Sequence, residues 1–94
     1  MLLFEWDDEK NKINIKKHKL SFFEAKFIFN DVNRIEIFDD IHSYDEDRYI
    51  TIGEINQVPI IVTVVYTERG QRIRIISARK ATAEERRMYY DSLQ

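Results

Sequence analysis

The sequence predicts an α+β domain that combines an antiparallel sheet with two helices near the N-terminus and one near the C-terminus. Two observations support this prediction. Apolar residues follow a helical period in the first third of the chain and an alternating, strand-like period from residue 34 to residue 79. Two capping boxes, which are typical of helix starts, pair Ser21 with Glu24 and Thr82 with Glu85. The expected element order is therefore β-α-α-β-β-β-β-α.

The first third of the chain is expected to form one short strand and two helices. Residues 2–6 predict the strand, and Asp7 caps a helix that runs to about Lys17. Acids at its start and lysines at its end suit the helix dipole. The second helix follows Ser21 and ends at residues 30–31. Its wide apolar stripe is formed by Phe22, Ala25 and Phe29, with Phe23 and Phe27 nearby.

The rest of the chain is expected to form four strands and a last helix. An acidic loop at 39–47 and tight turns at 56–57 and at Arg69-Gly70 separate the strands. The strand expected at 58–67 is rich in β-branched residues and apolar on both faces, which is typical of a central strand. The last helix starts after Thr82 and continues through Leu93. The expected strands are 34–38, 48–55, 58–67 and 71–79.

Length and composition exclude several classes of function. The 94 residues predict a single domain, 1–94. The absence of cysteine excludes a disulfide framework and a thiolate nucleophile, and with only two histidines we expect neither a metal site nor a cofactor. The longest largely apolar run, 58–66, falls short of the roughly 20 residues that span a membrane, and the start lacks a basic, apolar leader. We therefore expect a cytoplasmic protein with no membrane contact.

The net charge of −2 hides two opposite halves. Residues 1–47 carry 7 Lys or Arg against 12 Asp or Glu, whereas residues 48–94 carry 8 against 5. The run 36–47 contains six acids and no cation, and the run 69–80 contains five cations and no acid. Arginine binds phosphate through two parallel hydrogen bonds, so the second run indicates an oxyanion partner. A solvated face, or ion pairs with the acidic run, remains an alternative.

The arginine-rich strand is the strongest chemical signal. Alternation predicts Arg72 and Arg74 on one face and Ile73, Ile75 and Ser77 on the other, so the cations would stand on a rigid support. Arg79 and Lys80 come just before the last helix, whose N-terminal N–H groups also suit a phosphate.

Candidate proton-transfer groups are fewer than candidate phosphate-binding cations. His18 lies among Lys16, Lys17 and Lys19, and their like charges would leave it neutral and able to act as a base; it is equally an ordinary residue at a helix end. Tyr89 could assist proton transfer or simply pack in the core. The acidic run lacks the glycine of a calcium loop, so no metal site is expected there. No phosphate-binding glycine loop, nucleophile elbow or zinc-protease motif is present.

An ordered set of segments resembles the BrnT family of toxins and extends over nearly the whole chain. One departure from the family pattern is Lys19, where the family commonly has glycine after the histidine. The matching segments are Phe4-Glu5-Trp6-Asp7, Lys10, Asn14, Lys17-His18, Ser21-Phe22, Ala25, Asp47-Arg48-Tyr49, Gly53, Tyr66-Thr67-Glu68-Arg69, Arg74-Ile75-Ile76-Ser77-Ala78-Arg79-Lys80-Ala81, Glu85-Arg86-Arg87 and Tyr89.

The resemblance implies the toxin of a type II toxin-antitoxin system, with a RelE-like ribonuclease fold, that cleaves RNA and arrests growth. It also implies a cognate antitoxin resembling BrnA, a DNA-binding repressor, through which the toxin would meet DNA only indirectly. On this hypothesis a ribose 2′-OH attacks its own phosphate, which needs a base, an acid and cations but no metal.

The candidate residues on this hypothesis fall into three groups. The phosphate clamps would be Arg74, Arg79 and Arg48, and proton transfer would fall to His18 or Tyr89. The remaining RNA-binding residues would be Arg69, Arg72, Lys80 and Lys17. Two alternatives stay open: a non-catalytic module that binds RNA or protein through the arginine-rich strand, and a basic surface that mainly docks the antitoxin.

Overall fold

The computed structural model describes residues 2–55 and 59–94, and its elements confirm the α+β class. Within these residues no helix is long and apolar enough to cross a membrane. The tight turn expected at 56–57 lies outside the described residues. In chain order the elements are β1 (Leu3–Glu5), α1 (Asp8–His18), α2 (Phe22–Ala25), the 3-10 helix η1 (Lys26–Asn30), β2 (Ile35–Phe38), β3 (Arg48–Glu54), β4 (Ile61–Arg69), β5 (Arg72–Lys80) and α3 (Ala83–Ser92).

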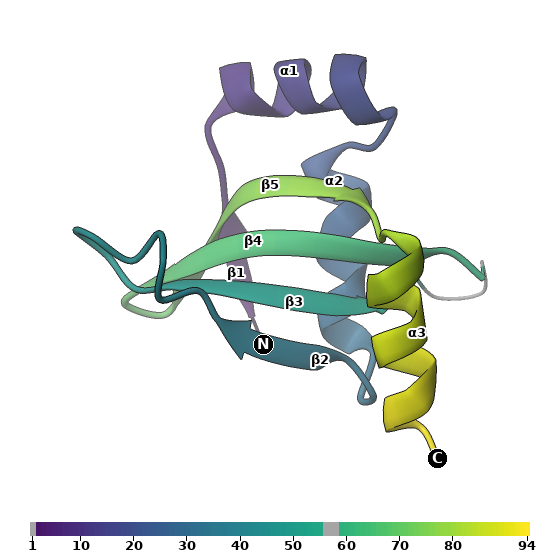
Figure 1. Ribbon diagram of the computed structural model, residues 1–94. Helices are drawn as coiled ribbons and strands as arrows, with labels where there is room; N and C mark the ends of the chain where they lie inside the picture. Colours follow the sequence, from purple (N-terminus) through teal and green to yellow (C-terminus); the bar gives the residue numbers. More distant parts are fainter. Residues whose placement is uncertain (1, 56–58) are drawn as a thin grey trace.

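The sheet is mixed rather than wholly antiparallel. Strands β2 to β5 form an antiparallel meander, as alternation predicts, and the five strands lie in the order β1-β5-β4-β3-β2. The strand β1, however, pairs in parallel with β5, with Leu3 opposite Arg72 and Glu5 opposite Arg74. The expected antiparallel sheet is therefore wrong at this edge, because the direction of a three-residue strand depends on its partner and leaves no trace in the alternation (Figure 1).

The expected second helix is divided, which is the one departure from the expected order of elements. After a single α-helical turn the chain tightens into η1. A 3-10 helix has three residues per turn, so it keeps Phe22, Ala25 and Ile28 on one side, and all three are fully buried. Phe23, expected within the apolar stripe, is instead 55% exposed.

Helices cover the two faces of the sheet unequally. One face packs against α2 and η1 through Phe22, Ile28, Val64 and Ile75, and this is the larger core. The other face meets only α3, at one end of the sheet, and Figure 1 shows α3 crossing in front of the strands while α2 lies behind them. Because α3 is short, much of this second face is uncovered. We call this part, which carries the partly exposed Arg48, Ile50, Val65 and Arg74 with the buried Thr67 between them, the open face.

A β-bulge in β5 decides which side chains reach the open face. Tyr66 is opposite Ile75 and Val65 is opposite Ser77, so Ile76 is an extra residue in the strand. Beyond it the alternation shifts by one position. Ala78 is therefore buried in the core in place of Ser77, which corrects the expected placement of Ser77.

The same shift acts on the arginines. Simple alternation would put Arg79 on the opposite face from Arg74, because the two residues are an odd number apart. With the bulge, Arg79 is opposite Thr63 and lies on the side of α3, as Arg74 does opposite Thr67.

Candidate functional site

A row of polar side chains crosses the open face from β3 to the sheet edge. Arg48 is opposite Thr67, Thr67 is opposite Arg74, and Arg74 is opposite Glu5 in β1. Residues directly opposite one another in a sheet bring their Cβ atoms to about 5 Å, so this row places two guanidinium groups on one support. The structure thus brings together Arg48 and Arg74, two of the predicted phosphate clamps.

Three arginines in or next to this row form ion pairs with carboxylates. Arg74 donates to the Glu5 carboxylate at 2.7 Å, and Arg72 approaches the same carboxylate at 4.0 Å. Arg69 donates to both oxygens of Glu46, at 2.9 and 2.8 Å, which raises the pKa of Arg69. Of these three pairs, only Arg69–Glu46 includes a residue of the acidic run 36–47. Ion pairing, left open by the sequence, therefore holds for these three arginines.

Arg48 differs from its neighbours. Its side chain is partly buried at the start of β3, and within the described residues its guanidinium makes no ion pair or hydrogen bond. Arg48 is therefore the cation of this row whose guanidinium N–H groups are not bonded to any other side chain among the described residues.

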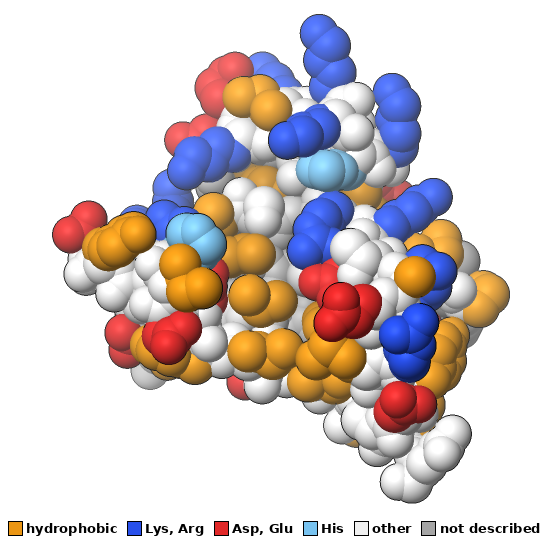
Figure 2. All heavy atoms as spheres, in the orientation of Figure 1, with side chains coloured by type: hydrophobic (Ala, Val, Ile, Leu, Met, Phe, Trp, Pro, Cys, Tyr) orange, Lys and Arg blue, Asp and Glu red, His pale blue; other side chains and the backbone are white. Residues whose placement is uncertain are grey.

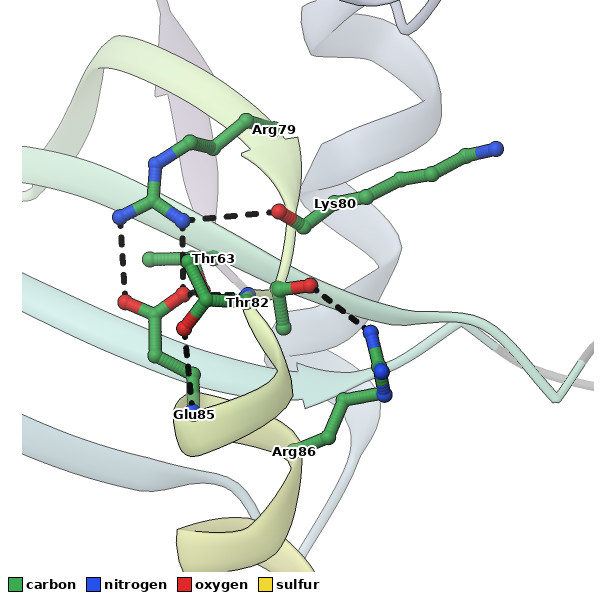
Figure 3. A network of polar contacts seen from close by, with 7 residues as sticks. Thr63, Arg79, Lys80, Thr82, Glu85 and Arg86 are labelled. Atoms are coloured by element: carbon green, nitrogen blue, oxygen red, sulfur yellow. Dashed lines mark hydrogen bonds and ion pairs between the residues drawn. The ribbon is translucent and has the colours of Figure 1, made fainter.

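A second cluster lies at the other end of β5, around Arg79 (Figure 3). Arg79 donates to both oxygens of Glu85 at 2.6 and 3.0 Å, and Glu85 also accepts from the Thr63 hydroxyl and the Thr82 backbone N–H. Burial alone would raise the pKa of the Glu85 carboxyl. The hydrogen bonds from Arg79, Thr82 and Thr63 outweigh burial and lower that pKa to about 2.

His18 lies at the same end of β5 as Arg79. The helix α1 follows β5 in the same direction, because β1 pairs with residues 72–74 and Asn14 then bonds to the backbone of Ala78. His18 comes one turn after Asn14. Its ring is partly buried and makes no hydrogen bond or ion pair within the described part of the chain. Lys17 and Lys80, both predicted to bind RNA, are exposed at this end.

Tyr89 is not part of either cluster. Its side chain is 3% exposed in the small core under α3, and its hydroxyl donates to the Asp31 carboxylate at 2.5 Å. Burial and this hydrogen bond both raise the pKa of Tyr89. Asp31 also accepts from the backbone N–H groups of Asn33 and Glu54. The structure therefore places Tyr89 in a contact that joins α3 to Asp31 at the end of η1, and Asp31 in turn holds the end of β3 through the Glu54 N–H.

The sequence gives no site role to the carboxylates that hold the arginines. Glu5 lies in a predicted strand, and its position opposite Arg74 depends on the parallel pairing of β1. Glu85 is predicted as the last residue of a capping box, a role that it does play. The sequence signal for the ion pair is the spacing of six residues between Arg79 and Glu85 across a strand-to-helix turn. This spacing lets the Glu85 carboxylate accept from both the Arg79 guanidinium and the Thr82 backbone N–H.

The acidic loop, residues 39–47, is held by its own hydrogen bonds. Asp39 accepts from the imidazole of His42 at 2.9 Å, and Ser43 bridges the backbone of Asp39 and Arg48. No group of three or more carboxylate or histidine side chains in the described residues is arranged to hold a metal ion.

The geometry describes a small α+β domain with cationic side chains on an open sheet face, and comparison with protein families identifies its class. Residues 6–85 match the model of a family of ribonuclease toxins of type II toxin-antitoxin systems. The chain belongs to this family, BrnT. Membership of a type II system implies an antitoxin partner. Comparison with curated protein sequences gives no significant match.

Proposed function

We propose that this protein is a metal-independent endoribonuclease whose activity is blocked by a cognate, DNA-binding antitoxin resembling BrnA. Family membership supports the ribonuclease assignment, and the row of arginines on the open face supports the position of the site. We place its action in the cytoplasm, where mRNA and antitoxin meet. We also assign the domain to the RelE-like ribonuclease folds, for which the α+β arrangement is the support.

The proposed reaction uses the substrate as its own nucleophile. The 2′-oxygen of a ribose attacks the adjacent phosphorus as a base takes its proton, and the bond from phosphorus to the 5′-oxygen breaks as an acid supplies a proton to that oxygen. The products are a 2′,3′-cyclic phosphate and a 5′-hydroxyl. Cations close to the phosphate stabilise the extra negative charge of the pentavalent transition state.

We assign proton transfer to His18 rather than to Tyr89. The imidazole of His18 has no partner within the described residues, so its nitrogens are available to the substrate. The Tyr89 hydroxyl is committed to Asp31 and buried. A proton-transfer group must come within hydrogen-bonding reach of the atom it serves, and the partly exposed His18, at the Arg79 end of β5, meets that condition better.

We assign the charge-stabilising role at the cleaved phosphate to Arg79, because it lies at the same end of β5 as His18. Arg74 and Arg79 are five residues apart, which is at most about 16 Å along a strand. Arg48 and Arg74 are therefore proposed to hold a neighbouring phosphate of the same RNA strand, with Arg69 and Arg72 beside them. To bind phosphate, Arg74 and Arg79 must exchange a carboxylate for it, whereas Arg48 binds without that exchange.

The single observation that carries the proposal is Arg48, a cation in the same row as Arg74 whose guanidinium has no side-chain partner among residues 2–55 and 59–94. Purified Arg48→Gln is expected to lose about a hundredfold in the rate of RNA cleavage, because RNA that is not held at this phosphate is misplaced for attack. Arg87→Gln, at an exposed position of α3, is the matched control and should keep its rate. Equal melting temperatures of the three proteins would show that folding is intact. An unchanged rate in Arg48→Gln would contradict this assignment.

The choice between an enzyme and a binding module requires a direct assay. Cleavage of purified RNA that persists in EDTA supports the proposal. Failure to cleave either free RNA or RNA on ribosomes, by a folded protein, would favour the non-catalytic module. If charge reversal at Arg72 weakens the antitoxin complex and leaves cleavage intact, the outer arginines dock the antitoxin.

A further inference from the structure

The helix α1 carries more positive charge than its fold requires. Lysines occupy positions 10, 12, 16, 17 and 19 in and just after the helix. The helix dipole accounts for the lysines of the last turn. It does not account for Lys10, which lies in the first turn, where a cation is disfavoured. The apolar residues Ile13 and Ile15 are exposed, at 63% and 41%, so the helix is not built to bury an apolar stripe.

The side of α1 that faces the sheet is identified by its hydrogen bonds. Asn14 is buried against Ala78 of β5, and Asn11, on one flank of Asn14, accepts from the backbone N–H of Phe22 in α2. Lys10 and Lys17 lie four residues before and three after Asn14, on its other flank. They therefore point away from α2, toward the side of the open face.

The remaining lysines of the helix lie elsewhere. Lys12 and Lys16 are two residues from Asn14 in either direction and so project from the far side of the helix. Lys12 pairs with Glu9 at 3.4 Å. Within the described residues, Lys10 and Lys17 have no carboxylate partner. Figure 2 shows blue side chains gathered over α1, above the apolar side chains of the open face.

The end of α1 leads to a pocket with cations at its rim. This pocket has a volume of about 320 Å³ and is more apolar than polar. Its one carboxylate, Glu24, is already engaged by Ser21 in a capping box. The pocket is lined by Lys19, Lys80, Leu20, Phe27, Ile55 and Ile60. An aromatic ring within apolar walls and two ammonium groups at the rim suit a nucleobase and its phosphate.

We propose that α1 is a binding ridge for single-stranded RNA: phosphates lie on Lys10 and Lys17 on the side of the open face, and the strand turns past Lys19 at the end of α1, so that a base enters the pocket beside Phe27 on the α2 side. Lys10 and Lys17 are about 10 Å apart along the helix, at about 1.5 Å per residue. This ridge supplies affinity from lysines that have no carboxylate partner in the described part of the chain, while Arg69, Arg74 and Arg79 stay with their carboxylates until the phosphate displaces them. The inference rests on the proposed function for the identity of the ligand.

The test measures binding without cleavage. The probe is a fluorescein-labelled, fully 2′-O-methylated oligouridine of about 12 nucleotides, a length within the range of single-strand binding sites. Its dissociation constant is measured by fluorescence anisotropy at several salt concentrations. Each lysine–phosphate contact contributes about 0.7 to the salt slope for a single strand. The double variant Lys10→Gln/Lys17→Gln should therefore lose about 1.4 from the slope and bind on the order of tenfold more weakly at about 0.1 M salt.

The matched control is Lys12→Gln/Lys16→Gln, which removes the same charge from the same helix on its far side. An equal loss in both double variants would overturn the ridge, because it would show only an effect of net charge. Phe27→Ala should weaken binding by roughly 5-fold or more with an unchanged slope, since stacking is not electrostatic. An unchanged dissociation constant in folded Phe27→Ala would overturn the base pocket. No binding by the wild-type protein, together with no cleavage of unmodified RNA, would overturn the proposed function itself.

Discussion

At the scale of single residues, Asn14 shows how one polar side chain can stand in for a strand. Its amide donates to the carbonyl oxygens of Ala78 and Leu20, at 2.7 and 2.9 Å, and accepts from the Ala78 N–H at 3.2 Å. It thereby occupies the edge of β5 beyond the point where β1 ends. The sequence could not reveal this role, because an asparagine inside a helix is ordinarily exposed and the partner is 64 residues away.

Replacing Asn14 should be costly for this reason. Asn14→Ala leaves three buried backbone groups without partners, and we expect the free energy of unfolding to fall by about 3–5 kcal/mol. Urea denaturation at neutral pH measures it. Asn14→Asp, which has the same shape but cannot donate, should also be strongly destabilising. Asn33→Ala, at an exposed position, should change stability by less than about 0.5 kcal/mol, and a similar cost at both sites would contradict the edge-capping role.

Glu85 makes stability depend on pH. Its pKa is lowered from 4.5 to about 2, so its contribution is complete above about pH 4.5 and is lost as the pH falls toward 2. With its side chain 18% exposed, this contribution is about 2–3 kcal/mol. The difference in unfolding free energy between the wild-type protein and Glu85→Gln should therefore shrink on acidification. Glu84→Gln, at an exposed position, is the control; a difference for Glu85→Gln that does not change with pH would contradict this reasoning.

At the scale of elements, the patterns that recur along the chain were predictable and the interruptions were not. The two capping boxes begin α2 and α3 as expected, and the meander follows the alternation of residues 34–79. The bulge at Ile76 has no marker such as glycine, so alternation misplaced Ser77. Arg79 reaches the side of α3 only because of that bulge. The cationic residues of the candidate site were therefore predictable from the sequence, but their grouping on one face depends on one extra residue, Ile76.

The crossing of η1 over β3 makes a further prediction. A Cβ atom at Gly53 would lie 3.0 Å from the Cβ of Arg34 and 3.4 Å from Ile28, so Gly53→Ala should cost about 1–3 kcal/mol through overpacking. Gly70→Ala should cost about 1 kcal/mol for a different reason. An added Cβ would meet no atom within 4 Å, but the φ of Gly70, +61°, is one that residues with a side chain disfavour.

Substitution by asparagine separates these two causes. Asparagine tolerates positive φ, so Gly70→Asn should recover most of the loss, whereas Gly53→Asn should be worse than Gly53→Ala. Thermal unfolding of the four variants measures both comparisons. Recovery by asparagine at position 53 would show that conformation, rather than contact, requires glycine there.

At the scale of the whole molecule, a near-neutral total charge describes neither side. Acids concentrate in residues 36–47, whereas cations lie along α1 and on β5. The acidic run at 36–47 and the cationic run at 69–80 were visible in the sequence. The pairing of Arg69, Arg74 and Arg79 with carboxylates was not, because two of those carboxylates lie in elements whose placement required the folded chain.

This segregation predicts binding to a polyanion despite an acidic isoelectric point. At pH 7.5, above its pI of about 5.7, the protein should be retained on heparin resin at about 50 mM salt, where exposed charges are incompletely screened. A protein of equal net charge with mixed surface charges should flow through. Lys10→Gln/Lys17→Gln should elute at lower salt than the wild type. Passage of the wild-type protein without retention would show that its cations do not act together.

The parallel pairing of β1 with β5 has a consequence for the order of folding during synthesis. Glu5 leaves the ribosome early, but its partner Arg74 is 69 residues later. Until β5 has emerged, the first strand has no edge to join, and the carboxylate that holds Arg74 is unengaged. Contacts between such distant segments form slowly, because a long loop must close first. The meander can therefore assemble before β1 joins it, and the edge of the arginine-bearing face is completed last.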